Sequence, residues 1–255
     1  MTGPYTAAVA SRDEILAFCD ELLDVASYPD YGPVGLHVGG ADEVRKVVCG
    51  VSASRDLFER AAEAGAQLVL VHHGLFWERD SRVVEPVLRE RLRALFGGDL
   101  TLAAYHLALD AHEEIGNNAL LARELGVEPE QRFAEVGWGG PLREPVAIDD
   151  FSSRVQGAVD RMPLVFPYGP QEIRRAAICS GGAASHLADA IAEGYDLFLT
   201  GEAAEPTKHL AKEAGVHFVA AGHYATETSG VQALAAKVAA RFGVEWEFVD
   251  LPNPV

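Results

Sequence analysis

Two adjacent histidines, His72 and His73, follow an apolar run at residues 68–71 and are followed at once by Gly74. This order is typical of a buried β-strand that delivers polar side chains to its carboxyl end. Neighbouring side chains of an extended segment point in opposite directions, so such a pair can serve two metal ions, or one ion and one structural hydrogen bond, more easily than it can chelate one ion. The stretch therefore predicts a metal site at a strand end.

Two further predicted strands end in side chains of the same kind. His106 and Asp110 follow one of them, and His223 and Glu227 follow the other. His223 and Glu227 are four positions apart at the start of a predicted helix and can face the same way. Imidazoles with carboxylates suit zinc, iron, manganese or a similar divalent ion. Two ions about 3.5–4 Å apart usually need a bridging carboxylate and can activate a bridging water for hydrolysis, so these ligands fit two ions better than one.

The candidate ligands are positioned by strands and helices that alternate along the chain. The apolar segment ending at His73 is one predicted strand, and the others cover residues 46–53, 100–105, 163–166, 175–180, 197–200, 217–221 and 245–249. The predicted helices cover residues 11–26, 54–64, 85–96, 119–125, 150–160, 185–193 and 226–241, with one more ending at residue 214. This alternation predicts an α/β fold with mostly parallel sheets, whose ligands gather outside the carboxyl ends of the strands.

A weak internal repeat predicts two related lobes. The stretches EAGAQLVLVHHG, AEGYDLFLTGE and EAGVHFVAAGH share one order: a helix end, a glycine, an apolar strand and then polar groups. The pattern weakens over residues 127–170, where Gly and Pro interrupt short strands. We therefore expect a first lobe over residues 1–127, carrying His72, His73 and Asp110, and a second over residues 128–255, carrying His223 and Glu227.

The composition of the 255-residue chain narrows its class. There is no apolar run long enough to span a membrane, and the first residues do not resemble a secretion signal, so we expect a cytoplasmic protein. Three separated cysteines without a C-x-x-C pair indicate a reducing compartment and argue against a thiolate zinc site. A net charge of −17 disfavours nucleic acid as a partner. A small anionic substrate remains compatible, because bound divalent cations reverse the local charge.

Other polar residues have ordinary structural interpretations. Glu202 either contacts a metal ligand without binding the metal itself or, more simply, is a carboxylate at a helix start. Asn117 and Asn118 are expected to cap a helix rather than to bind metal. Several histidines are expected to be satisfied polar residues or loop donors: His37, His112, His186, His209 and His217.

Three further features near the predicted strand ends have more than one interpretation. Cys179 is expected to be an inert buried thiol. Ser180-Gly181-Gly182 has the composition of a phosphate cradle at a helix start, although a glycine pair is a weak signal. Trp77 either walls the site or belongs to the core.

Five segments together resemble one known family: VHHGLFW, AYHLALDAHEEIGNNALLA, LTGEAAEPT, AAGHYATE and VDLPNP. They are similar to the YbgI-type, Nif-three-like dinuclear metal-centre proteins, whose members are often named GTP cyclohydrolase 1 type 2 homologues, and the resemblance covers nearly the whole chain. It implies two similar, intertwined three-layer α/β lobes with two divalent metal ions between them. It also implies a ring-shaped homohexamer built as a trimer of dimers.

The resemblance also implies roles for individual residues. His73 and Asp110 would bind one ion, His72 and His223 the other, and Glu227 would bridge the two. His106 is not among the family's direct ligands, and we expect it to lie just behind them.

The leading functional hypothesis is a metal-dependent hydrolase of a nucleotide-like or phosphorylated small molecule. A water bridging the two metals would attack carbon or phosphorus, by a ring opening like that of GTP cyclohydrolase or by phosphoester hydrolysis. His106 is the candidate catalytic residue for proton transfer. Two other hypotheses fit the same residues: a non-catalytic metal-binding or interaction protein, and a purely structural metal site with closed coordination.

Overall fold

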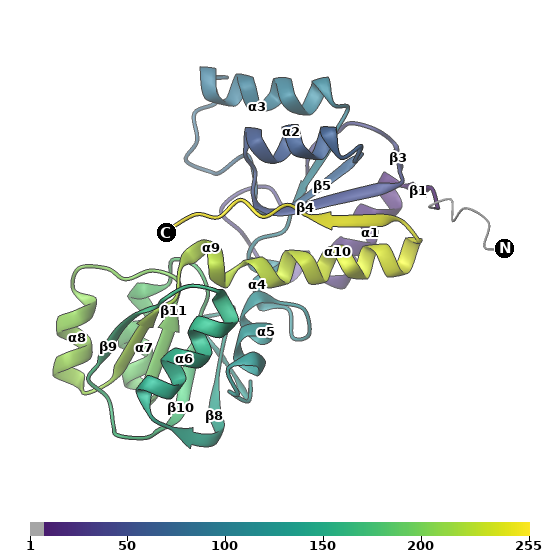
Figure 1. Cartoon of the computed structure of the whole chain (residues 1–255). Coiled ribbons are helices and arrows are strands. Elements are labelled where there is room, and N and C mark those ends of the chain that lie inside the picture. Colours follow the sequence, from purple (N-terminus) through teal and green to yellow (C-terminus); the bar gives the residue numbers. More distant parts are fainter. Residues whose placement is uncertain (1–7) are drawn as a thin grey trace. The chain divides into compact units, whose positions relative to one another are not determined.

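The computed structural model describes residues 8–255 and divides them into two compact units (Figure 1). The first unit contains the described residues up to Leu109 together with Val231–Leu251, and the second contains Asp110–Gly230 and Pro252–Val255. The expected division near residues 127 and 128 therefore falls inside the second unit. Residues 231–251 belong to the first unit because their strand pairs with a strand near the amino terminus.

The first unit is built on a five-stranded sheet in the order β13-β4-β5-β6-β2. Its strands are β2 (Gly35–Val38), β4 (Lys46–Ser52), β5 (Leu68–His73), β6 (Thr101–Ala104) and β13 (Glu245–Phe248). The first four in this order run parallel, and β2 pairs antiparallel with β6. Two short strands form a separate antiparallel pair, β1 (Ala10–Ser11) and β3 (Glu43–Val44).

Helices cover both faces of this sheet. They are α1 (Arg12–Leu22), the 3-10 turn η1 (Val25–Ser27), α2 (Arg55–Glu63), α3 (Pro86–Gly97) and α10 (Thr228–Phe242), which begins in the second unit. Figure 1 shows α2 and α3 on one face and α1 and α10 on the other. Strand β5 is buried on both faces, as its continuous apolar run predicts: Val69 and Val71 pack into the core beneath α2 and α3.

The second unit has a six-stranded sheet in the order β7-β8-β10-β11-β12-β9. Its strands are β7 (Gln131–Phe133), β8 (Gly137–Val146), β9 (Leu164–Pro167), β10 (Ile173–Ile178), β11 (Leu197–Thr200) and β12 (His217–Ala220). The three central strands β10, β11 and β12 are parallel, and the other three are attached by antiparallel pairing. This sheet is therefore mixed, while the first is parallel except at one edge.

Helices cover both faces of the second sheet as well. They are α5 (Asn117–Glu124), α6 (Ile148–Val159), the 3-10 turn η2 (Ala184–His186), α7 (Leu187–Ala192), α8 (Thr207–Ala214) and α9 (His223–Thr226); the short helix α4 (Leu107–Ala111) joins the two units in the chain. Residues of α5 and α6 share one core with the sheet, and residues of α7 and α8 share another. Each unit thus has three layers, and the predicted α/β class is confirmed.

Some predicted boundaries differ from the structure. The helix expected over residues 11–26 ends at Leu22, because Asp24 adopts a left-handed conformation (φ 47°) and the chain continues as η1. Ser11 is the N-cap residue of α1, but its side chain makes no capping hydrogen bond. The helix expected over residues 226–241 is α10, and a separate single turn, α9, precedes it.

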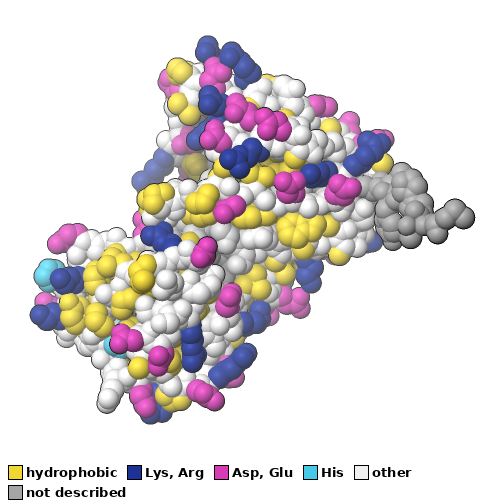
Figure 2. Space-filling model, in the orientation of Figure 1, with side chains coloured by type: hydrophobic (Ala, Val, Ile, Leu, Met, Phe, Trp, Pro, Cys, Tyr) yellow, Lys and Arg dark blue, Asp and Glu magenta, His cyan; other side chains and the backbone are white. Residues whose placement is uncertain are grey.

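Among the described residues, none of the helices is both long enough and apolar enough to cross a membrane. On the face shown in Figure 2, acidic and basic side chains are interspersed with apolar ones.

Candidate metal centre

His72 is held in one orientation at the end of β5. Its side chain is fully buried, and its Nδ1 lies 3.0 Å from the backbone oxygen of Tyr105, which follows the neighbouring strand β6. Because a carbonyl oxygen only accepts, Nδ1 carries the proton and donates it to Tyr105. Nε2 then carries the lone pair, which is the protonation state that a metal ligand requires.

His73 is the last residue of β5, and its ring lies beside that of His72. The ring centroids are 4.8 Å apart, and Nδ1 of His73 lies 3.2 Å from the hydroxyl oxygen of Ser52 on β4. Side chains of a regular strand would diverge, but β5 ends here and Gly74 follows. A Cβ at Gly74 would overlap the ring of His37, so only glycine fits at this position without a rearrangement.

His106 completes a cluster of three imidazoles within the first unit. Its ring centroid lies 4.9 Å from that of His72 and 5.5 Å from that of His73. One nitrogen of each ring lies within 4.8 Å of the others, a spacing at which the three can hold a metal ion. The donor set fits a borderline divalent ion such as zinc or iron.

Asp30, which the sequence did not single out, fixes the orientation of His106. The Asp30 side chain is 2% exposed, and its oxygens accept hydrogen bonds from His106 Nδ1 (2.9 Å) and from the backbone N–H groups of Leu107 and Tyr31 (2.9 and 2.7 Å). Burial alone would raise the pKa of Asp30, but these bonds and the charge of His106 hold it below its usual value. Asp30 is therefore an ionised carboxylate that orients His106.

Asp110 is held inside the second unit by two asparagines of α5. Its Oδ1 accepts a hydrogen bond from Asn117 Nδ2 (2.8 Å) and another from the Ser180 hydroxyl (3.3 Å). Its backbone oxygen accepts one from Asn118 Nδ2 (3.3 Å). Asn117 and Asn118 are fully buried, and the residue that caps α5 is Gly116. The expectation that the asparagines cap the helix is therefore wrong: they are its first two residues, and their side chains bond inward.

His223 and Glu227 face each other across the single turn of α9, as their spacing predicts. His223 Nε2 lies 3.3 Å from Glu227 Oε2, and His223 Nδ1 donates a hydrogen bond to Glu202. Glu202 follows β11 and lies five residues before α8 begins at Thr207, so it is not a helix-start carboxylate. It orients His223 instead, because a donor on Nδ1 leaves Nε2 as the coordinating nitrogen.

The two carboxylates set the protonation of His223. Burial lowers its pKa, but hydrogen bonds and charge from Glu227 and Glu202 outweigh burial and raise the pKa to about 9. Without a metal, the imidazolium ion between these carboxylates is the favoured form at neutral pH. A bound cation replaces this proton charge and satisfies the same carboxylates.

Gly181 makes room for the Glu227 carboxylate. Its backbone has φ +66°, and a Cβ there would overlap Glu227 Oε1 and lie 3.2 Å from His223 Nε2. One oxygen of Asp110 and one of Glu227 lie within 4.8 Å of each other in the same unit. The carboxylates of Asp110 and Glu227 and the imidazole of His223 therefore lie close together, and the space that Glu227 occupies is open only because residue 181 is glycine.

Cys179 is buried next to these carboxylates. Burial, with the negative charges of Asp110 and Glu227, raises the pKa of its thiol to about 12. The thiol is therefore favoured in its protonated form at neutral pH, and the expected burial of Cys179 is confirmed.

The Ser180-Gly181-Gly182 segment is not a phosphate cradle. The backbone N–H groups of Ser180 and Gly181 donate to Asn118 Oδ1 (2.6 Å) and Thr226 Oγ1 (3.1 Å), so they are already used inside the unit. The 3-10 turn η2 separates this segment from α7, which begins only at Leu187.

Two of the histidines expected to be structural act as predicted. His37 Nε2 donates to the Pro33 oxygen (2.8 Å), and its Nδ1 accepts from the Leu75 N–H (3.2 Å). His217 makes the matching pair of bonds with Pro170 and Gly169 (2.8 and 3.1 Å). Both histidines fasten loops to strands.

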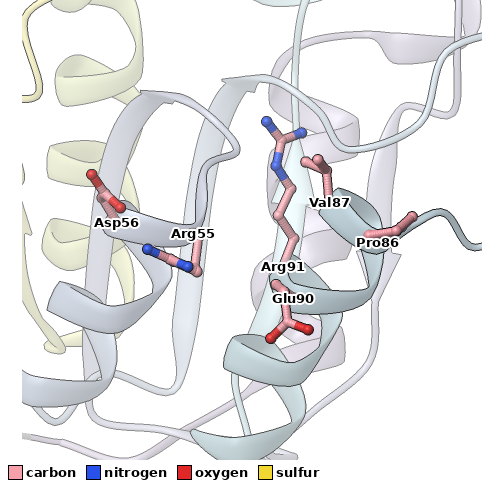
Figure 3. A pocket seen from close by; sticks show the side chains of 6 residues that line it. All are labelled: Arg55, Asp56, Pro86, Val87, Glu90 and Arg91. Atoms are coloured by element: carbon pink, nitrogen blue, oxygen red, sulfur yellow. The ribbon is translucent and has the colours of Figure 1, made fainter.

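A surface hollow of about 420 Å³ lies between the first turns of α2 and α3 (Figure 3). It is lined by Arg55, Asp56, Pro86, Val87, Glu90 and Arg91. These side chains balance in charge and offer no imidazole or thiol. The hollow is therefore distinct from the candidate metal centre.

Comparison with known proteins gives a consistent result over nearly the whole chain. The family model Duf34/NIF3 (NGG1p interacting factor 3) matches residues 10–254. A protein of Pseudomonas aeruginosa named GTP cyclohydrolase 1 type 2 homolog is 47% identical over 240 residues, which cover 92% of this chain and 95% of that protein.

Two solved structures are similar to this one in both sequence and fold. The protein ybgI, described as of unknown function, has a TM-score of 0.94 and 40% identity, and the match covers 96% of this chain and 100% of that one. A protein of Thermus thermophilus, TTHA1606, has a TM-score of 0.91 and 37% identity, with the same coverage.

Proposed function

The chain belongs to the Duf34/NIF3 family, and from this premise we propose that it is a metal-dependent hydrolase that binds two divalent ions. Its substrate would be a nucleotide-like or phosphorylated small molecule. The observation that carries the proposal is the cluster of three imidazoles after β5 and β6, with one nitrogen of each ring within 4.8 Å of the others. The name GTP cyclohydrolase 1 type 2 homolog belongs to the relatives and agrees with a nucleotide-like substrate.

We propose that the imidazole cluster of the first unit and the acidic cluster of the second bind the same two ions. The assignment follows the family pattern: His73 and Asp110 bind one ion, His72 and His223 bind the other, and Glu227 bridges them. The charges support this sharing, since neutral imidazoles alone leave two divalent ions uncompensated and two carboxylates reduce that charge.

The supporting contacts agree with this assignment. Tyr105 holds His72, Glu202 holds His223, and Asn117 holds Asp110. Such partners fix the tautomer or the direction of a ligand before the metal binds.

Two bound divalent ions would supply Lewis acidity and activate a bridging water for hydrolysis. His106 would act as the general acid and base of the hydrolysis. Its Nδ1–H is donated to Asp30, so Nε2 is the atom that would hold and release a proton during hydrolysis. The ionised Asp30 stabilises the imidazolium formed at that moment.

An activity screen tests the proposal. The purified chain, loaded in turn with zinc, manganese or iron, would be incubated with a panel of nucleotides and phosphoesters while phosphate release and ring absorbance are followed. We expect turnover that a chelator abolishes and that Glu227→Gln loses. Glu205→Gln, which changes an exposed glutamate of the same unit, serves as the control and keeps the activity.

A fully metal-loaded chain without turnover on this panel would contradict the hydrolase. It would leave a metal-binding or interaction protein as the better description.

We also propose that the chain forms a homohexamer, as its family resemblance implies. Light scattering or native mass spectrometry of the purified chain would give a mass six times that of one 27.3 kDa chain. A monomer at micromolar concentration would contradict it.

A further inference from the structure

Two aromatic side chains flank His106 in the first unit. The Trp77 ring lies 5.2 Å from that of His106 at an interplanar angle of 85°, and the Tyr31 ring lies 6.4 Å from it at 56°. Trp77 also lies 6.3 Å from His73. Tyr31 is 63% exposed, so a large part of its ring is open to solvent.

The backbone around both aromatic residues is fixed. The Tyr31 N–H donates to Asp30, and its oxygen accepts from the N–H of Glu78 at 2.7 Å. The Trp77 N–H donates to Asp80 Oδ2 at 2.9 Å. The loop of Tyr31 and the loop of Trp77 are therefore bonded to each other beside the imidazole cluster.

Glycine at position 32 allows these two loops to approach closely. A Cβ at Gly32 would overlap the backbone oxygen of Phe76, the residue before Trp77. A larger residue at this position would force the two loops apart. The spacing of the aromatic rings therefore depends on Gly32.

From this arrangement we propose that Tyr31 and Trp77 form a stacking platform for a planar heteroaromatic ring of the substrate, such as a purine base. Aromatic faces held on a fixed backbone bind flat rings at little entropic cost, and they do so without selecting one base by hydrogen bonds. This inference rests on the proposed function and names the class of substrate that the hydrolase takes.

The surroundings favour a neutral ring over a charged group. An organic cation would be repelled by the two ions of the proposed centre, and the platform itself contributes no basic side chain to hold a phosphate. The chain as a whole carries a net charge of −17, so an anionic group would be drawn to the ions instead. A nucleotide combines both parts, since its base is flat and neutral and its phosphate is attracted to cations.

Ligand binding to the full, metal-loaded chain tests the platform. The probes are guanosine and adenosine, with ribose as the matched ligand that lacks the ring and glycerol phosphate as a phosphoester without a ring. Calorimetry measures affinity, and tryptophan fluorescence reports contact with Trp77. Trp246→Phe on β13 is the matched control, because it removes a partly exposed tryptophan of the same unit outside the platform.

We expect Tyr31→Ala to weaken nucleoside binding on the order of tenfold, as the loss of one stacking partner does. Trp77→Ala should have a similar effect, while Tyr31→Phe and Trp77→Phe keep most of the affinity. These conservative variants also show that a loss in the alanine variants comes from the missing ring rather than from misfolding. Trp246→Phe should bind as the unaltered chain does and keep the fluorescence change.

The outcomes separate the platform from the hydrolase. Nucleoside binding that depends on Tyr31 but comes without any turnover would support the platform and contradict the proposed function. Nucleosides that bind no better than ribose, or that bind Tyr31→Ala and Trp77→Ala as tightly as the unaltered chain, would overturn the platform. In that case, metal-dependent hydrolysis of glycerol phosphate would leave the hydrolase standing.

Discussion

Replacing Gly181 by alanine tests how closely the second unit is built around the Glu227 carboxylate. An added Cβ would come within 3.0 Å of Glu227 Oε1, closer than real Cβ atoms approach, and would lie 3.2 Å from His223 Nε2. The carboxylate must therefore move by several tenths of an ångström or more. Metal–ligand distances vary by only about 0.2 Å, so this movement removes Glu227 from a productive ligand position.

The magnitude has two separable parts. Alanine in the left-handed conformation at φ +66° costs about 1–2 kcal/mol of folding stability. Displacing the ligand adds a loss of metal affinity that we expect to be about 10- to 100-fold, as when a residue that supports a ligand is changed.

Gly194→Ala is the matched control for the first part. Gly194 belongs to the same unit and has φ +75°, but a Cβ there meets no atom within 4 Å. Gly194→Ala therefore loses stability through the left-handed backbone conformation but does not displace a metal ligand.

Thermal denaturation and calorimetric titration with zinc or manganese would be run on both variants. We expect similar losses of stability, and a loss of metal affinity only in Gly181→Ala. Equal metal affinity in the two variants would contradict this expectation and show that Glu227 does not need the space that Gly181 provides.

Three further predictions concern His37 and two carboxylates that orient other histidines. Burial lowers the pKa of His37 below 6.5, so the unfolded chain binds more protons than the folded chain below that pH, and folding stability falls as the pH drops from 6.5 towards the folded pKa. Denaturation of His37→Gln should therefore show a flatter dependence of stability on pH, and a pH dependence identical to that of the unaltered chain would contradict this. Asp30→Asn should lower metal-dependent turnover at least about tenfold while metal content is unchanged, since His106 loses its orienting carboxylate; unchanged turnover would count against a role for His106 in proton transfer. Glu202→Gln should weaken metal binding about tenfold or more through His223, measured by titration, and an unaltered affinity would show that Glu202 does not support it.

The residues that local patterns could identify are those at strand ends. His72 and His73 follow an apolar run of the length and composition of a buried strand, and the structure ends β5 at His73. The four-residue spacing of His223 and Glu227 predicts a shared face, and their side chains meet at 3.3 Å. In both cases the signal lies within a few residues of sequence.

The supporting residues could not be found in this way because their partners are distant in the chain. Asp30 bonds to His106 across 76 positions, and Ser180 bonds to Asn118 across 62. Glu202 follows a glycine after a strand, a position that also suits a helix start, and only its bond to His223 distinguishes the two.

Which unit a segment belongs to also depends on strand pairing between segments that are far apart in the sequence. The last strand, β13, pairs in parallel with β4 and so belongs to the first unit, although about 200 residues separate them. Hydrophobic periodicity predicts that a strand is present at residues 245–249 but not which sheet it joins. Pairing also adds the antiparallel strands β7, β8 and β9 to the second sheet, where short segments broken by Gly and Pro gave a weak pattern.

Anomalous X-ray scattering from a crystal of the chain grown with zinc or manganese would show whether two ions share these ligands, because it locates each ion relative to the side chains that bind it. We expect two peaks per chain, one within about 2.0–2.3 Å of His73 and Asp110 and the other equally close to His72 and His223, with Glu227 close to both. A single peak, or peaks that touch only the imidazoles of the first unit, would contradict it.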